Sequence, residues 1–89
     1  MREIEVQVAN RLGLHARAAA RFVRLASSFE SRITVSRDDS RVDGKSILGL
    51  LTLAARQGTL LRLTAEGGDA DQALAQLDTL VRGRFGEAE

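Results

Sequence analysis

The chain of 89 residues has no cysteine and no proline, and it has a single histidine. Without cysteine it can form neither a disulfide framework nor a thiolate metal site, and one histidine excludes a multi-histidine metal site. We therefore expect no metal and no cofactor. Tryptophan and tyrosine are also absent, and none of the three phenylalanines lies in a basic strand on which nucleic-acid bases could stack.

The chain also has no large excess of positive or negative charge and no long hydrophobic segment. The formal net charge of +1 is too small for general affinity for nucleic acid. No run comes near the roughly 18 apolar residues of a membrane helix, and the charged and apolar residues that alternate over Met1–Glu5 are unlike a signal peptide. We expect a cytoplasmic protein with no nucleic-acid partner and no direct membrane insertion.

Periodic hydrophobic patterns predict one domain over residues 1–89. Alternating apolar side chains predict strands at residues 3–8, 32–36, 41–43 and 61–66. Helical spacing predicts helices at residues 16–28, 47–53 and 70–82. Four strands cannot hide both faces of a sheet and three amphipathic helices are available to cover one, so we expect an α+β open-faced sandwich. So short a chain leaves little room for a deep substrate cavity, and nothing in it demands more than a monomer.

Particular residues mark the faces and ends of the two longer helices. The buried face of the first helix is predicted to hold Ala16, Ala19, Ala20, Val23 and Ala26, and that of the last helix Ala70, Ala73, Leu74, Leu77, Leu80 and Val81. Asp69 and Gln72 predict a capping box before the last helix, and Gly83 predicts its end. We expect the acidic tail Glu87–Glu89 to be solvated.

The segment Gly13-Leu14-His15-Ala16-Arg17 places the only histidine at the start of a predicted helix. A helix N-terminus offers unpaired N–H groups, so an anion attached to His15 would meet the backbone amides of Ala16, Arg17 and Ala18. The guanidinium of Arg17 could bind phosphate oxygens. The pattern predicts a phosphohistidine site. On position alone, an exposed or capping histidine is the alternative, and no general base or triad accompanies the motif.

This segment resembles the signature of the HPr family, the histidine phosphocarriers of the bacterial phosphoenolpyruvate-dependent sugar phosphotransferase system. The resemblance implies a four-stranded antiparallel sheet with three helices on one face, in the order βαββαβα. It also implies that His15 accepts a phosphoryl group on Nδ1 (pros-phosphohistidine) from phospho-enzyme I and passes it to IIA components of sugar permeases. Arg17 would stabilise that group, and the protein would be a carrier, not an enzyme. Ala18 stands where the family usually has proline, which leaves the placement of Arg17 open.

The stretch Gly44–Leu51 is similar to the second signature of that family, which surrounds a regulatory serine. On the residues alone, Ser46 is a helix N-cap. The resemblance implies that it is also a target of HPr kinase/phosphorylase, and the added charge would repel an acidic partner.

A docking surface for partners is predicted near these two motifs. Arg21 and Arg24 follow Arg17 on one helical face and are expected to form a basic rim, with a simple solvated face as the alternative. Ile47, Leu48 and Leu51 are expected to supply its apolar centre.

Three other functions are compatible with parts of the pattern. One is a regulatory phosphocarrier of the nitrogen-related branch of the family. Another is an interaction module that is modified only at Ser46 and never at His15. The third, a small RNA-binding domain, is disfavoured because stacking aromatics are missing.

Overall fold

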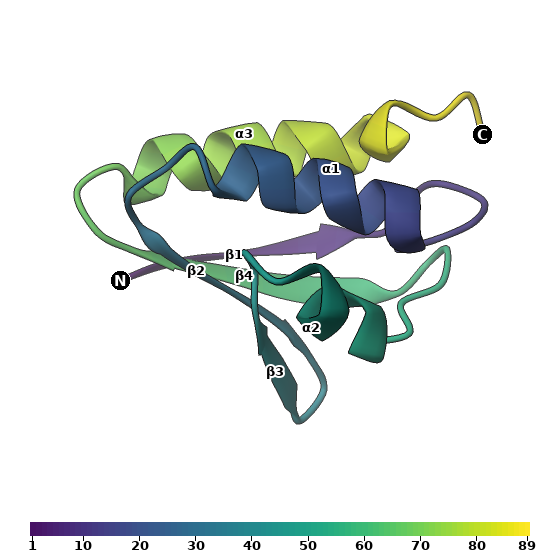
Figure 1. Cartoon of the computed structure of the whole chain (residues 1–89), viewed down its shortest axis with the longest axis horizontal. Coiled ribbons are helices and arrows are strands. Elements are labelled where there is room, and N and C mark those ends of the chain that lie inside the picture. The colour runs from purple at the N-terminus through teal and green to yellow at the C-terminus, as the bar shows by residue number, and fades with distance from the viewer.

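Four strands form one sheet in the computed structural model, which describes residues 1–89 (Figure 1). They are β1 (Arg2–Gln7), β2 (Arg32–Arg37), β3 (Ser40–Asp43) and β4 (Leu60–Glu66). Their order in the sheet is β1-β4-β2-β3, and every neighbouring pair is antiparallel. The predicted strands are confirmed, and β4, which comes last along the chain, lies inside the sheet.

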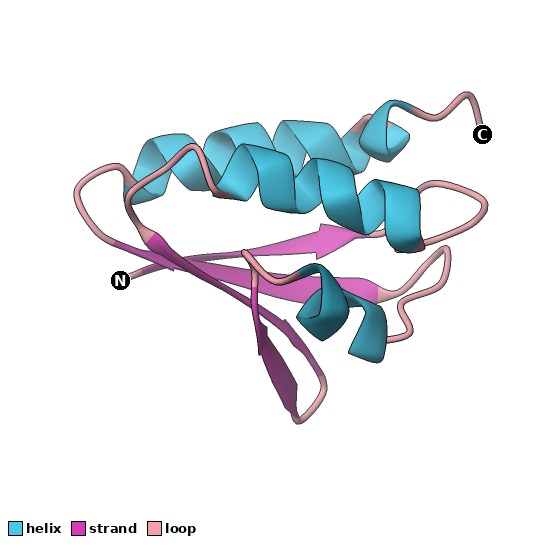
Figure 2. Ribbon diagram, in the orientation of Figure 1, coloured by secondary structure: helices cyan, strands magenta, loops and turns pink.

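Three helices cover one face of this sheet (Figure 2). They are α1 (Ala16–Ala26), α2 (Ile47–Thr52) and α3 (Ala70–Arg82), and a 3-10 turn, η1 (Arg84–Gly86), follows α3. α1 and α3 lie side by side, and the short α2 contacts α1 and β3. The predicted open-faced sandwich is confirmed. No helix combines the length and the apolar character that a membrane span requires.

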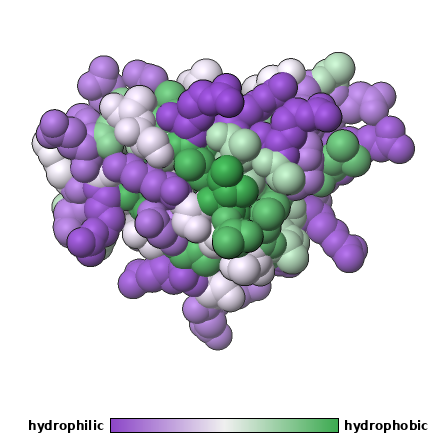
Figure 3. Space-filling view, in the orientation of Figure 1, coloured by the Kyte–Doolittle hydropathy of each residue, from purple (hydrophilic) through white to green (hydrophobic).

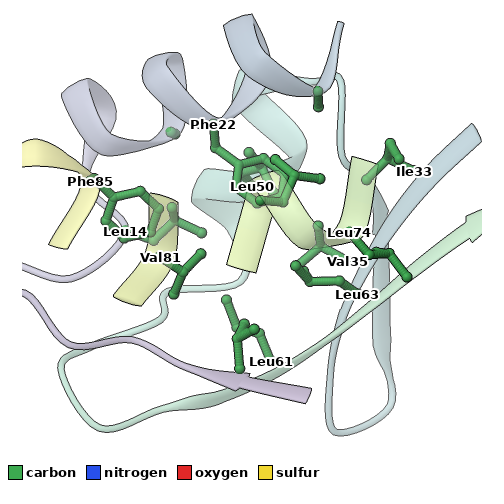
Figure 4. Close-up of a cluster of buried hydrophobic side chains, with 14 of the residues drawn as sticks. Leu14, Phe22, Ile33, Val35, Leu50, Leu61, Leu63, Leu74, Val81 and Phe85 are labelled. Carbon is green, nitrogen blue, oxygen red and sulfur yellow. The ribbon is translucent and has the colours of Figure 1, made fainter. Parts of the chain in front are cut away.

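The hydrophobic core lies between the sheet and the helices (Figure 4). The register pairs Val6 with Leu61 and Val35 with Leu63, and these side chains are buried. Phe22 of α1 belongs to the same cluster. Burying one large apolar side chain contributes about 1.5–3 kcal/mol, so this cluster is what holds α1 and the site at its start against the sheet.

The predicted buried face of α1 is confirmed in part: Ala19 and Ala26 are buried, and Val23 packs against the core. The buried residues of α1 are Ala18, Ala19, Phe22 and Ala26, whereas Ala16 is exposed and Ala20 and Val23 are half-buried. The phenyl ring removes more apolar area from water than a valine or an alanine does, so its burial decides how the helix is rotated. α1 also ends at Ala26, two residues earlier than predicted. The buried face of α3 is confirmed except for Leu80, which is half-buried.

The predicted capping box at the start of α3 is wrong. Asp69 makes no side-chain cap, because its carboxylate accepts hydrogen bonds from the amides of Glu30 (2.9 Å) and Ser31 (3.0 Å) and from the Ser31 hydroxyl. The Ser31 hydroxyl and these amides lower the pKa of Asp69, although burial opposes the shift. Asp69 therefore ties the α1–β2 connection to the start of α3.

Candidate functional site

A turn at Gly13 sets the direction from which His15 enters α1. Gly13 has a φ of +70°, a conformation that L side chains rarely adopt, and a Cβ here would collide with the carbonyl oxygen of Ala55. The amide of the next residue, Leu14, donates to that same carbonyl at 2.9 Å, and the Leu14 side chain is buried. The turn is thus pinned to the segment before β4.

His15 is the N-cap of α1, with extended backbone angles (φ −79°, ψ −179°). Its Nδ1 accepts a hydrogen bond from the amide of Arg17 at 3.3 Å. The amides of Ala16 and Ala18 donate to no acceptor in the protein. Nδ1 therefore lies at the positive end of α1, beside backbone donors that remain available to an anion.

The other ring nitrogen of His15 contacts the C-terminal tail, which the sequence did not reveal. Nε2 lies 2.5 Å from Oε2 of Glu87. Oε1 of Glu87 accepts from Nδ2 of Asn10 at 2.8 Å, and the same amide group of Asn10 donates to the carbonyl of Gly13 at 2.7 Å. The Glu87 side chain is only 12% exposed. The prediction of a solvated tail is therefore wrong for this residue.

A buried phenylalanine brings the tail to His15. Phe85 is fully buried although it lies after the end of α3, and its φ of +53° turns the chain back towards α1. Its carbonyl accepts from Nη1 of Arg21 at 2.6 Å. Figure 1 shows the C-terminus at the same end of the molecule as the start of α1. One sequence signal could have indicated this contact, because Phe85 is the only large apolar residue after Gly83 and requires burial.

Hydrogen bonding keeps the carboxyl group of Glu87 ionised. Donation from the Asn10 side chain is the main cause that lowers the pKa of Glu87, and the contact with His15 acts in the same direction, whereas burial opposes both. A negative charge therefore stands next to the imidazole at neutral pH.

The predicted arginine row is only partly free. Arg17 and Arg24 are exposed, but Arg21 is half-buried and bound to the Phe85 carbonyl. Arg17 and Arg21 line an open depression with Arg11 and residues of the tail, among them Glu87. The structure thus gathers basic side chains next to the start of α1.

Ser46 is the N-cap of α2, as predicted. Its Oγ accepts from the amide of Gly49 at 3.0 Å. Beyond it, Ile47 (40% exposed), Leu48 (78%) and Leu51 (36%) face solvent, while Leu50 is buried. Figure 3 shows a hydrophobic patch over α2 with hydrophilic side chains around it. The structure places all three predicted docking residues, one isoleucine and two leucines, on one exposed surface.

A histidine whose Nδ1 faces a helix N-terminus, on a βαββαβα open-faced sandwich, defines the class of small histidine phosphocarriers that the motifs resemble. Comparisons with known proteins agree with this assignment. A family model described as "PTS HPr component phosphorylation site" matches residues 2–83. The chain belongs to the HPr family, the phosphocarrier proteins of the phosphotransferase system.

Relatives in this family cover nearly the whole chain. The phosphocarrier protein HPr of Neisseria meningitidis serogroup A is 48% identical over 84 residues, 94% of each chain. The phosphocarrier protein NPr of Shewanella violacea is 42% identical and covers 97% of this chain and 94% of its own. A crystal structure of HPr from Thermoanaerobacter tengcongensis superimposes with a TM-score of 0.95 at 43% identity, over 100% of both chains.

Proposed function

We propose that His15 accepts a phosphoryl group on Nδ1 from phospho-enzyme I and passes it to IIA components of sugar permeases. The observation that carries this proposal is the unequal surroundings of the two ring nitrogens. Nε2 is taken by Glu87 at 2.5 Å, whereas Nδ1 lies beside the amides at the start of α1. Nδ1 is therefore the nucleophile.

The transfer step balances without a separate base. The lone pair of Nδ1 forms the new bond to phosphorus, and the bond from phosphorus to the carrying atom of enzyme I breaks, its electron pair staying on enzyme I. Because Nε2 keeps its hydrogen, the ring of phosphorylated His15 carries a positive charge. With so little covalent chemistry to perform, placement and charge stabilisation carry the reaction.

The start of α1 and Arg17 stabilise the transferred group. Once Nδ1 is bonded to phosphorus it no longer accepts from the Arg17 amide, which then turns to a phosphoryl oxygen. The amides of Ala16 and Ala18 have no other acceptor in the protein. The exposed guanidinium of Arg17 adds a charge-assisted contact.

The exposed apolar residues of α2 and the nearby arginines form one docking surface. Ile47, Leu48 and Leu51 supply its centre, and Arg17 and Arg24 its basic rim. Arg21 is less accessible to a partner because it is half-buried and donates to the Phe85 carbonyl. An acidic partner would associate faster with this rim, and the apolar centre would hold it.

Ser46 regulates that docking when it is phosphorylated by HPr kinase/phosphorylase. A phosphate adds a charge of about −2 and is tolerated at a helix N-terminus. Ser46 directly precedes Ile47 of the apolar patch, so the new charge would repel an acidic partner there. We propose a cytoplasmic, monomeric carrier of this kind.

The mass of the intact protein tests the carrier function. After incubation with phosphoenolpyruvate and enzyme I from the same cell, we expect one acid-labile phosphoryl group, which is absent from His15→Ala. Arg17→Ala should be phosphorylated more slowly. Failure of the unaltered protein to take up phosphate from its own enzyme I would refute the proposal and leave an interaction module modified at Ser46.

Similarity to the NPr of Shewanella violacea favours one second candidate, a regulatory phosphocarrier of the nitrogen-related branch. The two candidates differ in their acceptors. Phosphorylated protein presented with IIA components of both branches should lose its phosphoryl group faster to the sugar-specific one. The opposite preference would establish the regulatory function.

A further inference from the structure

We propose that Glu87 is a positioning residue for phosphoryl transfer: it orients the imidazole of His15 through Nε2 and stabilises the positive charge that the ring acquires when Nδ1 is phosphorylated. This inference deepens the proposed function and rests on it. It assigns a task to the C-terminal tail, which the two sequence motifs do not reach.

The contacts at the two ring nitrogens specify one tautomer. A backbone N–H can only donate, so Nδ1, which accepts from the Arg17 amide at 3.3 Å, must carry a lone pair. An ionised carboxylate can only accept, so Nε2, at 2.5 Å from Glu87, must carry the hydrogen. Both contacts leave the nucleophilic lone pair on the nitrogen at the helix start. A ring held at both nitrogens is also prevented from turning over.

The same carboxylate opposes the charge that transfer creates. Phosphorus adds to Nδ1 while the hydrogen stays on Nε2, so the ring becomes cationic. Glu87 lies on the Nε2 side of the ring, away from the incoming phosphoryl group. Its negative charge therefore stabilises the imidazolium, as the carboxylate of a serine-protease triad does. The ring is cationic whenever His15 is phosphorylated. The contact with Glu87 is therefore present both after the phosphoryl group is accepted and before it is passed on.

Asn10 holds the carboxylate in place. Its side-chain amide nitrogen donates to Glu87 (2.8 Å) and to the carbonyl of Gly13 (2.7 Å). Asn10 is fully buried, and its Oδ1 has no hydrogen-bond partner. Turning the amide over would place that oxygen against two acceptors, so the observed orientation is the one that the site selects. Glu87 is thus linked to the same turn that carries His15.

The backbone of the tail accepts strain to reach this position. Arg84 and Phe85 both have positive φ angles, 60° and 53°, which cost about 1 kcal/mol or more each for non-glycine residues. Burial of the Phe85 ring and donation from Arg21 to its carbonyl (2.6 Å) offset this cost. A tail that was merely solvated would relax out of this conformation.

Three variants separate orientation from charge. Glu87→Ala removes both the acceptor and the charge, and Glu87→Gln keeps a carbonyl acceptor without the charge. Glu89→Gln is the matched control, because it neutralises an exposed carboxylate of the same tail that pairs with Arg11. Thermal unfolding of each variant tests whether the fold is retained.

The first readout is the Nε2–H proton of His15 in the unphosphorylated, 15N-labelled protein. We expect a strongly downfield, slowly exchanging resonance in the unaltered protein and in Glu89→Gln. Glu87→Ala should lose it, and Glu87→Gln should keep it with weaker protection. An unchanged resonance in Glu87→Ala would overturn the orienting role. This measurement needs no phosphoryl transfer, so it decides that role even if the proposed function fails.

The second readout is the rate of phosphorylation by enzyme I and phosphoenolpyruvate. Loss of a carboxylate that orients a metal-binding histidine commonly lowers activity about 10- to 100-fold. By analogy we expect kcat for Glu87→Ala to fall at least about 10-fold with little change in KM. Glu87→Gln should lie between it and the control. Rates for both variants within about twofold of Glu89→Gln would refute the stabilising role. If the unaltered protein takes up no phosphate, the carrier function fails and the charge argument with it.

Discussion

We predict that removing the ring of Phe85 destabilises the protein and releases the tail, because burial of this ring holds the tail in place. Phe85 is fully buried in the core cluster although it lies beyond the end of α3. Phe85→Ala leaves a cavity between α1 and α3 and releases the segment that carries Glu87. Truncation of a buried phenylalanine costs about 3–5 kcal/mol, and a domain of this size loses about 4–8 °C in Tm for each kcal/mol. We therefore expect Tm to fall by at least about 12 °C.

Phe85→Ala is compared with Phe29→Ala in two measurements, urea unfolding and hydrogen exchange at Nε2 of His15. Phe29 is also buried, but it lies in the α1–β2 connection, whereas His15 lies at the start of α1. Both variants should be less stable, whereas only Phe85→Ala should expose the Nε2–H of His15 to fast exchange in the folded protein. A loss below about 1 kcal/mol for Phe85→Ala, or equal exchange in the two variants, would show that Phe85 does not hold Glu87 against His15.

Three further outcomes are expected. Ser46→Ala should lower the free energy of unfolding by about 0.5–2 kcal/mol because the Gly49 amide loses its acceptor, whereas Ser46→Asp, which can still cap α2, should lose less in the same urea titration. The pKa of Asp69 is lowered in the folded protein, so the stability that its carboxylate contributes is complete above the ordinary value of 3.8 and is lost as the pH falls through the lowered value. Asp69→Asn should therefore lose stability less steeply than the unaltered protein as the pH falls. An unchanged acid-unfolding profile would contradict the hydrogen bonds to Ser31. The amide of Ala18 donates to no acceptor, so Ala18→Pro should raise the free energy of unfolding, measured by calorimetry, by about 0.4–1 kcal/mol. A lower free energy of unfolding would show that the buried position cannot hold the pyrrolidine ring of proline.

The parts of the fold and site that the sequence predicts are those with local signals. Strand alternation, helical spacing and the Gly13–Arg17 motif each depend on neighbouring residues, and the strands, the cap at Ser46 and the place of His15 follow from them. Docking of partners and phosphorylation of His15 remain predictions. The helix predicted over residues 16–28 ends at Ala26, and it is rotated so that Phe22 is buried and Ala16 is exposed, because burial of the phenyl ring outweighs the alanine pattern.

The contacts that the sequence does not reveal join residues far apart. Glu87 reaches His15 across 72 positions, and Asp69 binds Ser31 across 38. A carboxylate in a polar stretch has many possible partners, and which one it meets is decided only when the core has positioned both segments. In each case the local prediction, a solvated tail or a capping box, assigned the carboxylate to water or to its own helix.

The place of β4 inside the sheet has a consequence for how the chain acquires its structure. β1, which is synthesised before the other three strands of the sheet, pairs only with β4, at residues 60–66. β1 therefore has no pairing partner until β4 has been synthesised. Contacts between residues so far apart in the sequence slow folding, because the intervening loop must close before they form. His15 meets Glu87 later still. A chain that has not yet reached Glu87 would carry the histidine but not its finished surroundings, so competence for transfer would require synthesis and folding at least as far as that residue.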